Sequence, residues 1–136
     1  MAQKQAVIFE LDRVLYGLDI MEVQEIIRMV EITPLAGLDF STEGIINLRG
    51  QVIPVVNLCQ KLGLNARVYD ESSRVVVVES NGVKTGLIVD RVLEVGNYDS
   101  EETVPAAQAG IDAIYLKEIV KKGKILWLVL NLSALH

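Results

Sequence analysis

An internal repeat constrains this chain more than any other feature of its sequence. Residues 7–10 (VIFE) align with residues 76–79 (VVVE), and the alignment continues without a gap for about twenty positions. It places Gly17 opposite Gly86, 69 residues away. Self-similarity at a fixed spacing predicts that one structural unit occurs twice in the fold.

The register of the repeat changes in its later part. There we align residues 46–49 with 114–117, and residues 55–58 with 129–132. The matching blocks keep their order throughout, so the repeat extends over nearly the whole chain. We expect two corresponding halves, residues 1–66 and 70–136, within one domain over residues 1–136.

Both halves contain short runs rich in Val and Ile that are bounded by Gly, Asn and Asp, a pattern typical of β-strands. Residues 20–27 also have helical spacing, which predicts a helical turn that leads into a strand. Asn57 is expected to cap a short helix that stops at Gly63, with Asn131 as its counterpart, and residues 98–110 are expected to form a surface loop. The expected strands are 5–12, 14–19, 25–31, 44–49, 51–56, 73–80, 82–89, 91–95, 111–121 and 124–130.

Ten short strands in two matching sets predict an all-β fold of two five-stranded barrels with a few short helices. A half of about 60 residues buries only about 60% of the surface of its unfolded chain and is marginal alone. The halves should therefore share a core, and an exchange of strands between them remains open.

Charge and composition exclude several classes of function. The net charge is −5, and an acidic protein repels phosphate backbones, so nucleic acid is not expected as a partner. The sequence shows neither a signal peptide nor an apolar run of about 20 residues. We therefore expect a cytoplasmic protein that does not insert into the membrane, and the single cysteine, Cys59, fits a reducing compartment.

Residues suited to catalysis or metal binding are scarce. The only histidine, His136, is the last residue, and Cys59 has no histidine near it in sequence that could activate its thiol. No catalytic residue, metal or cofactor is expected. A small enzyme or ligand-binding barrel remains an alternative from another class of function, and it would require a pocket with convergent polar groups.

Two segments carry the most specific pattern of the sequence. Residues 43–58 read EGIINLRGQVIPVVNL, with Arg49-Gly50 between two apolar strands, and residues 16–27 read YGLDIMEVQEII. Together they resemble the CheW family of bacterial chemotaxis coupling proteins. The resemblance is strong up to about residue 64 and weaker afterwards. Asn57 and Cys59 depart from the acidic and basic residues usual in that family.

The resemblance implies two five-stranded SH3-like barrels and a non-catalytic adaptor in two-component signalling. The expected partners are the cytoplasmic tip of methyl-accepting chemoreceptors and the regulatory domain of a CheA-type histidine kinase. Such an adaptor would be recruited to the inner face of the membrane through its receptors. An adaptor of the same family in a type IV pilus, gliding or phototaxis pathway is the alternative.

The resemblance also implies residues that bind partners. Glu25 and Arg49 correspond to a charged pair important for assembly in the family, although the same pair could instead be a salt bridge that orders a turn. For Val23 and the glycines, packing or turn geometry is at least as good an explanation. Ile26 and Val89 are expected in an apolar groove between the two barrels, into which receptors insert in this family. The complete set of expected partner-binding residues is Val23, Glu25, Ile26, Gly44, Arg49, Gly50 and Val89.

Overall fold

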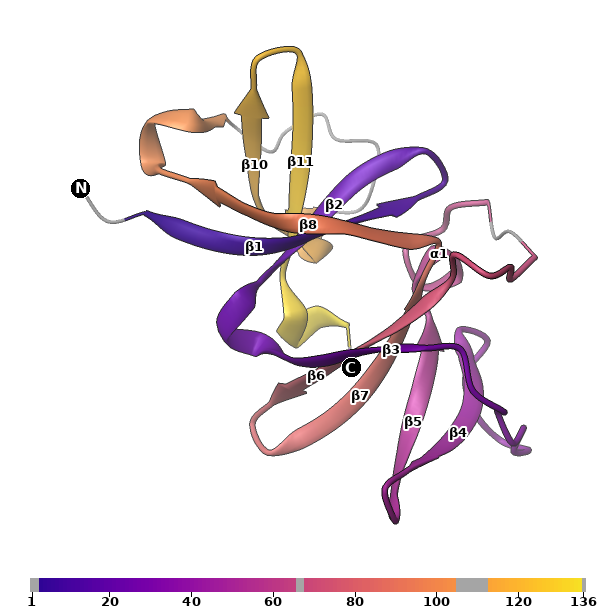
Figure 1. Ribbon diagram of the computed structural model, residues 1–136. Coiled ribbons are helices and arrows are strands. Elements are labelled where there is room, and N and C mark those ends of the chain that lie inside the picture. Colours follow the sequence, from indigo (N-terminus) through magenta and orange to yellow (C-terminus); the bar gives the residue numbers. More distant parts are fainter. Residues whose placement is uncertain (1–2, 66–67, 105–112, 136) are drawn as a thin grey trace.

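The chain forms an all-β protein of two curved sheets, as the computed structural model in Figure 1 shows. The structure describes residues 3–65, 68–104 and 113–135. The strands are β1 (Lys4–Leu11), β2 (Val14–Asp19), β3 (Val23–Arg28), β4 (Thr42–Leu48), β5 (Gln51–Asn57), β6 (Arg74–Ser80), β7 (Val83–Val89), β8 (Arg91–Tyr98), β9 (Thr103–Val104), β10 (Leu116–Lys122) and β11 (Ile125–Leu130). The predicted all-β class is confirmed.

Each sheet combines strands from both halves of the sequence. Sheet A has the order β8-β1-β2-β11-β10-β9, and sheet B has the order β3-β6-β7-β5-β4. Replacing each strand of sheet B by its repeat counterpart gives β8-β1-β2-β11-β10, which is sheet A without β9. We propose that residues 1–136 form a single domain of two interlocked barrels.

The pairing registers of the two sheets also correspond. Gly17 pairs with Val129 in the parallel contact of β2 with β11, and Gly86 pairs with Val55 in the parallel contact of β7 with β5. Corresponding bulges interrupt the β1–β8 and β6–β3 ladders. Related sequences thus produce the same ladder twice, down to its irregularities.

The hairpin registers correct one part of the predicted repeat. Leu48 pairs with Gln51 and Lys122 pairs with Ile125 on either side of the two hairpin turns. Residues 46–49 therefore correspond to residues 120–123, which belong to β10 and the turn after it. The alignment of 46–49 with 114–117 is therefore wrong. It matched similar apolar residues, whereas the structural equivalence follows the two-residue turns at 49–50 and 123–124.

A short pairing closes each sheet into a barrel. In sheet B, an isolated bridge between Thr33 and Ile45 joins the chain that follows β3 to β4. In sheet A, β9 follows β8 along the chain and pairs with β10 through Val104 and Ile119. Both contacts link one edge of a sheet to its opposite edge, and this closure removes exposed strand edges.

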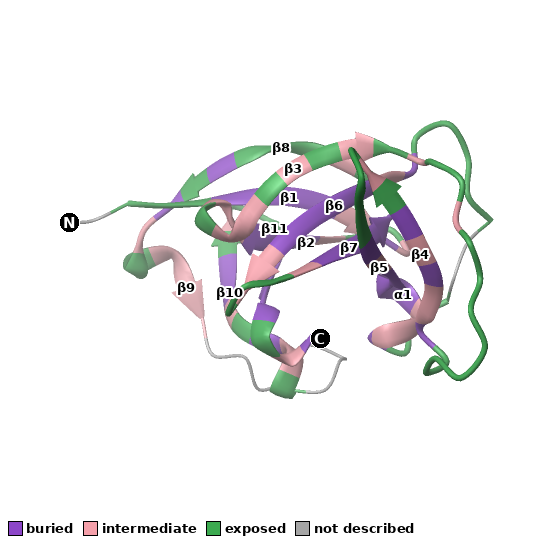
Figure 2. Cartoon of the chain, turned by 90° about the horizontal axis from the view of Figure 1, so that it is seen from below, coloured by how far each residue is buried: buried purple, intermediate pink, exposed green. Residues whose placement is uncertain are grey.

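The largest apolar cluster includes side chains of both sheets. It contains Phe9 and Leu18 from sheet A and Val76 and Leu87 from sheet B, all with no exposed area. The short helix α1 (Leu58–Lys61) and the final 3-10 turn η4 (Leu132–Ala134) also contribute buried residues to it. The two barrels thus share a core, and Figure 2 shows the buried residues concentrated where they meet.

The short helices follow the predictions in part. A 3-10 turn, η1 (Ile20–Glu22), leads into β3 as expected, and the Asn57 side chain accepts a hydrogen bond from the Gln60 amide at the start of α1. Asn131, by contrast, makes no side-chain capping bond to η4.

Two predicted segments need correction. The region expected to be a loop, 98–110, contains the 3-10 turn η2 (Ser100–Glu102) and β9, although its residues 105–110 lie outside the described part. The strand expected at 111–121 begins only at Leu116, after the 3-10 turn η3 (Ala113–Tyr115). The first two residues of that expected strand, 111 and 112, lie outside the described residues. So does His136.

Three tyrosines have raised pKa values in the folded protein, so we predict that the folded state loses stability at alkaline pH. Burial raises the pKa of Tyr16 to about 12, and burial together with hydrogen bonds to Glu43 and Glu118 raises the pKa values of Tyr69 and Tyr98. The unfolded chain loses these protons near pH 10 and the folded chain does not, so the free energy of unfolding should fall between pH 10 and 12.

Urea unfolding at several pH values measures this dependence. Each such tyrosine contributes a slope of up to about 1.4 kcal/mol per pH unit. Tyr98→Phe should therefore show a shallower decline than the wild type over this range. Equal slopes for the two proteins would contradict the assignment, and tyrosine absorbance followed in parallel reports the ionisation itself.

Candidate functional site

The β4–β5 hairpin carries an exposed arginine on a strained turn. Leu48 pairs with Gln51, so Arg49 and Gly50 form the two-residue loop, with φ angles of 52° and 84°. Both residues lie in the left-handed region, as a type I′ turn requires. Asn47 fixes the turn, because its side-chain Oδ1 accepts a hydrogen bond from the Gly50 amide at 2.8 Å.

The Arg49 guanidinium forms an ion pair with Glu25 of β3. Its Nη2 lies 2.7 Å and 2.8 Å from the two carboxylate oxygens. The Arg49 side chain is 71% exposed and that of Glu25 is 29% exposed. An exposed pair of this kind stabilises a fold by only about 0–1 kcal/mol. The predicted charged pair therefore exists, and its contribution to folding should be small.

The ion pair leaves hydrogen-bonding capacity on Arg49. Both bonds to Glu25 use the same nitrogen, Nη2. Among the described residues, Nη1 and Nε have no hydrogen-bond partner, and both can donate. Glu25 thus holds the guanidinium in one orientation while leaving the rest of its donors for another molecule.

Gly44 has a backbone role that no other residue can fill. Its φ is +155°, and a Cβ atom built on it would lie 2.2 Å from the carbonyl oxygen of Thr33. The close approach belongs to the Thr33–Ile45 bridge that closes sheet B. Gly50, in contrast, has open space around it. A direct contact of either glycine with a partner stays a prediction.

The other predicted residues do not gather around Arg49. Val23 is half-buried against the shared core. Ile26 lies on the same face of β3 as Val23, because the two residues pair with Val76 and Val78 on either side of a bulge, and it is 40% exposed. Val89 is 1% exposed and belongs to the core. It offers no surface to a partner in this structure. Glu25, Arg49 and Gly50 are therefore the only members of the predicted set that lie together at one exposed turn.

Two exposed valines near the turn were not predicted. Val52 follows the turn on β5 and is 59% exposed, and Val83 at the start of β7 is 52% exposed. Since β5 and β7 pair in parallel, with Val55 opposite Gly86, these two valines lie at the same end of sheet B. A hydrogen bond between Lys84 and Gln51 joins the same two strands. The strand pattern alone could not reveal this exposure, because it depends on where the barrel ends.

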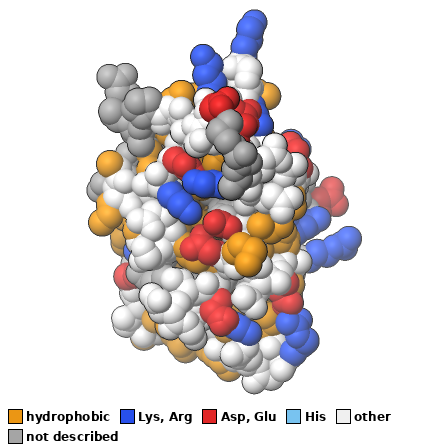
Figure 3. Space-filling view, turned by 90° about the vertical axis from the view of Figure 1, so that its left-hand side faces the viewer, with side chains coloured by type: hydrophobic (Ala, Val, Ile, Leu, Met, Phe, Trp, Pro, Cys, Tyr) orange, Lys and Arg blue, Asp and Glu red, His pale blue; other side chains and the backbone are white. Residues whose placement is uncertain are grey.

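Charge is mixed on the side of the molecule shown in Figure 3, where acidic and basic side chains alternate around small apolar areas. No group of three or more residues suited to metal binding occurs among the described residues. No helix in the described part is long and apolar enough to cross a membrane. The exposed β4–β5 turn thus stands out through its geometry and its charged pair.

Comparison with known proteins identifies similar chains. Residues 5–136 match the CheW-like domain family. A chemotaxis protein CheW from Treponema pallidum is 32% identical over 98% of this chain and 82% of its own length. The protein PilI of Pseudomonas aeruginosa is 32% identical over 66% of this chain and 52% of its own length. The crystal structure of a scaffolding protein, TtCheW of Thermoanaerobacter tengcongensis, superposes with a TM-score of 0.89 at 37% identity, covering 96% of this chain and 90% of that one.

Proposed function

This chain belongs to the CheW family, and we propose that it is a non-catalytic chemotaxis adaptor that joins chemoreceptors to a CheA-type histidine kinase. The scaffold structure that it resembles covers nearly its whole length. Its mechanism would be positional: one surface holds the kinase, another holds the receptor, and the receptor state shifts the kinase equilibrium through the shared scaffold. The adaptor would work in the cytoplasm, at the inner face of the membrane.

The observation that carries the proposal is the oriented, exposed Arg49 at the end of sheet B. Its free donors suit a carboxylate or carbonyl acceptor on a partner, and arginine is common among residues that dominate binding. Val52 and Val83 would supply apolar contact beside it. A charged group next to small apolar residues favours a specific and reversible contact. We assign this end of sheet B to the kinase regulatory domain.

A second contact would serve the receptor. Ile26 lies on the exposed face of β3, away from Glu25, so the same strand can present residues to two partners. Contacts through two different patches are heterologous and can close into rings. The assignment of Ile26 to the receptor rests on the family resemblance.

A second pathway is also supported by a specific observation. The similarity to PilI raises an adaptor of a type IV pilus system as the alternative. The similarity to PilI covers 66% of this chain, whereas the similarity to the Treponema CheW protein covers 98% of it. Both alternatives share the adaptor mechanism and differ in the receptor and kinase that are joined.

Co-purification tests the proposal directly. The full chain is mixed with a receptor cytoplasmic fragment and a CheA-type kinase encoded in the same genome. We expect a ternary complex and receptor-dependent kinase activity only when the adaptor is present. Receptor and kinase from a pilus gene cluster, where one exists, form the second arm. Absence of binding to the proteins of either arm would rule out the adaptor function.

A further inference from the structure

Within the described residues, the chain crosses from one sheet to the other at two points. The strands of sheet A lie within residues 4–19 and 91–130, and those of sheet B lie within residues 23–89. The first crossing runs through η1, whereas the second is a single residue, Asp90, between β7 and β8 (Figure 1). Because the second connection is so short, the contacts of Asp90 bear directly on how the two sheets are placed.

Asp90 contacts elements of both sheets. Its Oδ2 accepts a hydrogen bond from the amide of Asp12, in the β1–β2 turn of sheet A, at 2.8 Å. Its own amide donates to the carbonyl of Glu10 in β1 at 3.1 Å. Its Oδ1 lies 3.9 Å from the thiol sulfur of Cys59, in the helix α1 that packs beside β7 of sheet B. The half-buried Asp90 thus joins sheet A to an element next to sheet B.

The shared core between the barrels consists of apolar side chains such as Leu18 and Leu87. Apolar burial is favourable but non-directional, and packed layers can slide past one another by small shear motions. A hydrogen bond, in contrast, depends on the angle between donor and acceptor. The bonds of Asp90 are therefore suited to select one orientation of the barrels from those that the core alone would permit.

The first crossing is held differently. In the repeat, Met21 stands at the position of Asp90, 69 residues earlier, and its side chain is 84% exposed. The Met21 amide donates to the side chain of Asp19, two residues before it, at 2.9 Å. Asp19 also pairs with Lys117 of β10, which belongs to sheet A. The polar contacts of Asp19 thus remain in this turn and in sheet A. A crossing can therefore be built without a carboxylate that joins the two sheets.

We propose that Asp90 is a positioning residue that fixes the relative orientation of the two barrels, and that receptor control of the kinase depends on this orientation. The kinase is assigned above to the end of sheet B beside Arg49, and the receptor is expected in the groove between the barrels. A change at that groove can shift the kinase equilibrium only if the barrels keep a defined orientation. The role in control rests on the proposed adaptor function, whereas the role in orientation rests on the contacts of Asp90.

Residual dipolar couplings of the backbone amides, measured by NMR on the full chain, test the orientation. The couplings of both sheets in the wild type should fit one alignment tensor on the structure. Asp90→Ala removes the acceptor of the Asp12 amide and should require separate tensors for the two sheets. Asp90→Asn keeps an acceptor oxygen and should restore the single tensor. A fit of Asp90→Ala to the same single tensor as the wild type would overturn the proposal.

Asp39→Ala is the matched control. Oδ1 of Asp39 accepts hydrogen bonds from the amides of Ser41 and Thr42, so this carboxylate holds a turn next to β4 and does not join the sheets. The control should keep the single tensor, and separate tensors for it would count against a specific role of Asp90. If Asp90→Ala does not fold, Asp90→Glu takes its place with the same expected result, because the longer side chain displaces the carboxylate.

Kinase assays test the role in control. Asp90→Ala should reduce the receptor-dependent change in kinase activity about fivefold. Its affinity for the kinase alone should stay within about twofold of the wild type, because Asp90 and Val83 lie at opposite ends of β7. Receptor control equal to that of the wild type would overturn this role. If the wild type bound neither protein, the adaptor function would fail, and the dipolar couplings would still decide the role of Asp90 in orientation.

Discussion

Replacement of Arg49 by asparagine should leave the protein folded and weaken its binding to the kinase regulatory domain at least tenfold. Asparagine adopts the left-handed backbone of the turn more readily than arginine does, with φ at 52° in the structure. That gain offsets the loss of the exposed ion pair with Glu25, so the free energy of unfolding should change by less than about 1 kcal/mol. Urea unfolding measures the stability, and isothermal titration calorimetry measures the affinity.

Arg13→Asn is the matched control. Arg13 lies in the β1–β2 turn with φ at 69°, so the substitution removes the same charge from the same backbone conformation. It should leave kinase binding unchanged. If Arg49→Asn instead reduced stability by more than about 2 kcal/mol while affinity stayed at the wild-type value, the Glu25–Arg49 pair would be structural only.

Substitution of Gly44 by alanine should destabilise the protein by about 3 kcal/mol, through backbone strain and a steric clash. The added Cβ would lie 2.2 Å from the Thr33 carbonyl oxygen and 2.8 Å from its carbon, so the two chain segments must separate. Their separation would break the Thr33–Ile45 bridge and open sheet B at its closing contact. A lower urea midpoint with an unchanged slope is the expected measurement.

Gly50→Ala provides the comparison for Gly44→Ala. Its φ of +84° also disfavours a side chain, but no atom lies within 4 Å of the added Cβ. The cost should be about 1 kcal/mol, from the left-handed conformation alone. Equal effects of the two substitutions would show that the Thr33 contact adds nothing to stability.

Local sequence signals predicted most of the fold because strands and turns are set by near neighbours. Asn81-Gly82 forms a hairpin turn where the expected strands 73–80 and 82–89 meet, with both residues at positive φ, and the Val-rich run before it is a buried strand. The start of β10 was missed because apolar residues before Leu116 form a 3-10 turn instead of extending the strand. The later repeat was misaligned because its register depends on pairing across the hairpin, which sequence similarity does not show.

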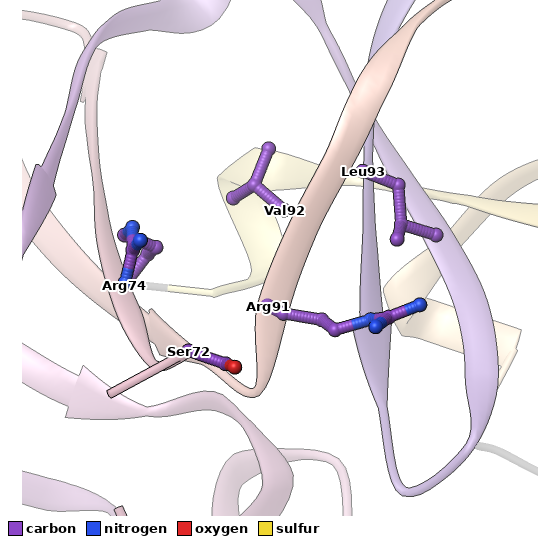
Figure 4. Close-up of a pocket in the computed structure, with 5 residues that line it drawn as sticks. All are labelled: Ser72, Arg74, Arg91, Val92 and Leu93. Atoms are coloured by element: carbon purple, nitrogen blue, oxygen red, sulfur yellow. The ribbon is translucent and has the colours of Figure 1, made fainter. Parts of the chain in front are cut away.

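The candidate site was predictable where the sequence pattern is specific. The pairing of Glu25 with Arg49 followed from the family resemblance, and the structure shows the ion pair. The exposure of Val52 and the burial of Val89 depend on how the barrels pack, so neither could be derived from a strand pattern. The sequence also did not reveal that Arg74 of β6 and Arg91 of β8 line one cavity, shown in Figure 4, because the two residues belong to different sheets.

The strand order has a consequence for synthesis on the ribosome. Sheet B uses only residues 23–89, a continuous stretch, whereas sheet A joins residues 4–19 to residues 91–130. Sheet B can therefore close soon after β7 has emerged, while β2 must wait for β11, near the end of the chain, before it is paired on both sides. During that interval the first hairpin has only part of its sheet, and the residues of sheet B that share its core can cover its apolar face. The shared core would thus protect the nascent chain before it stabilises the finished one.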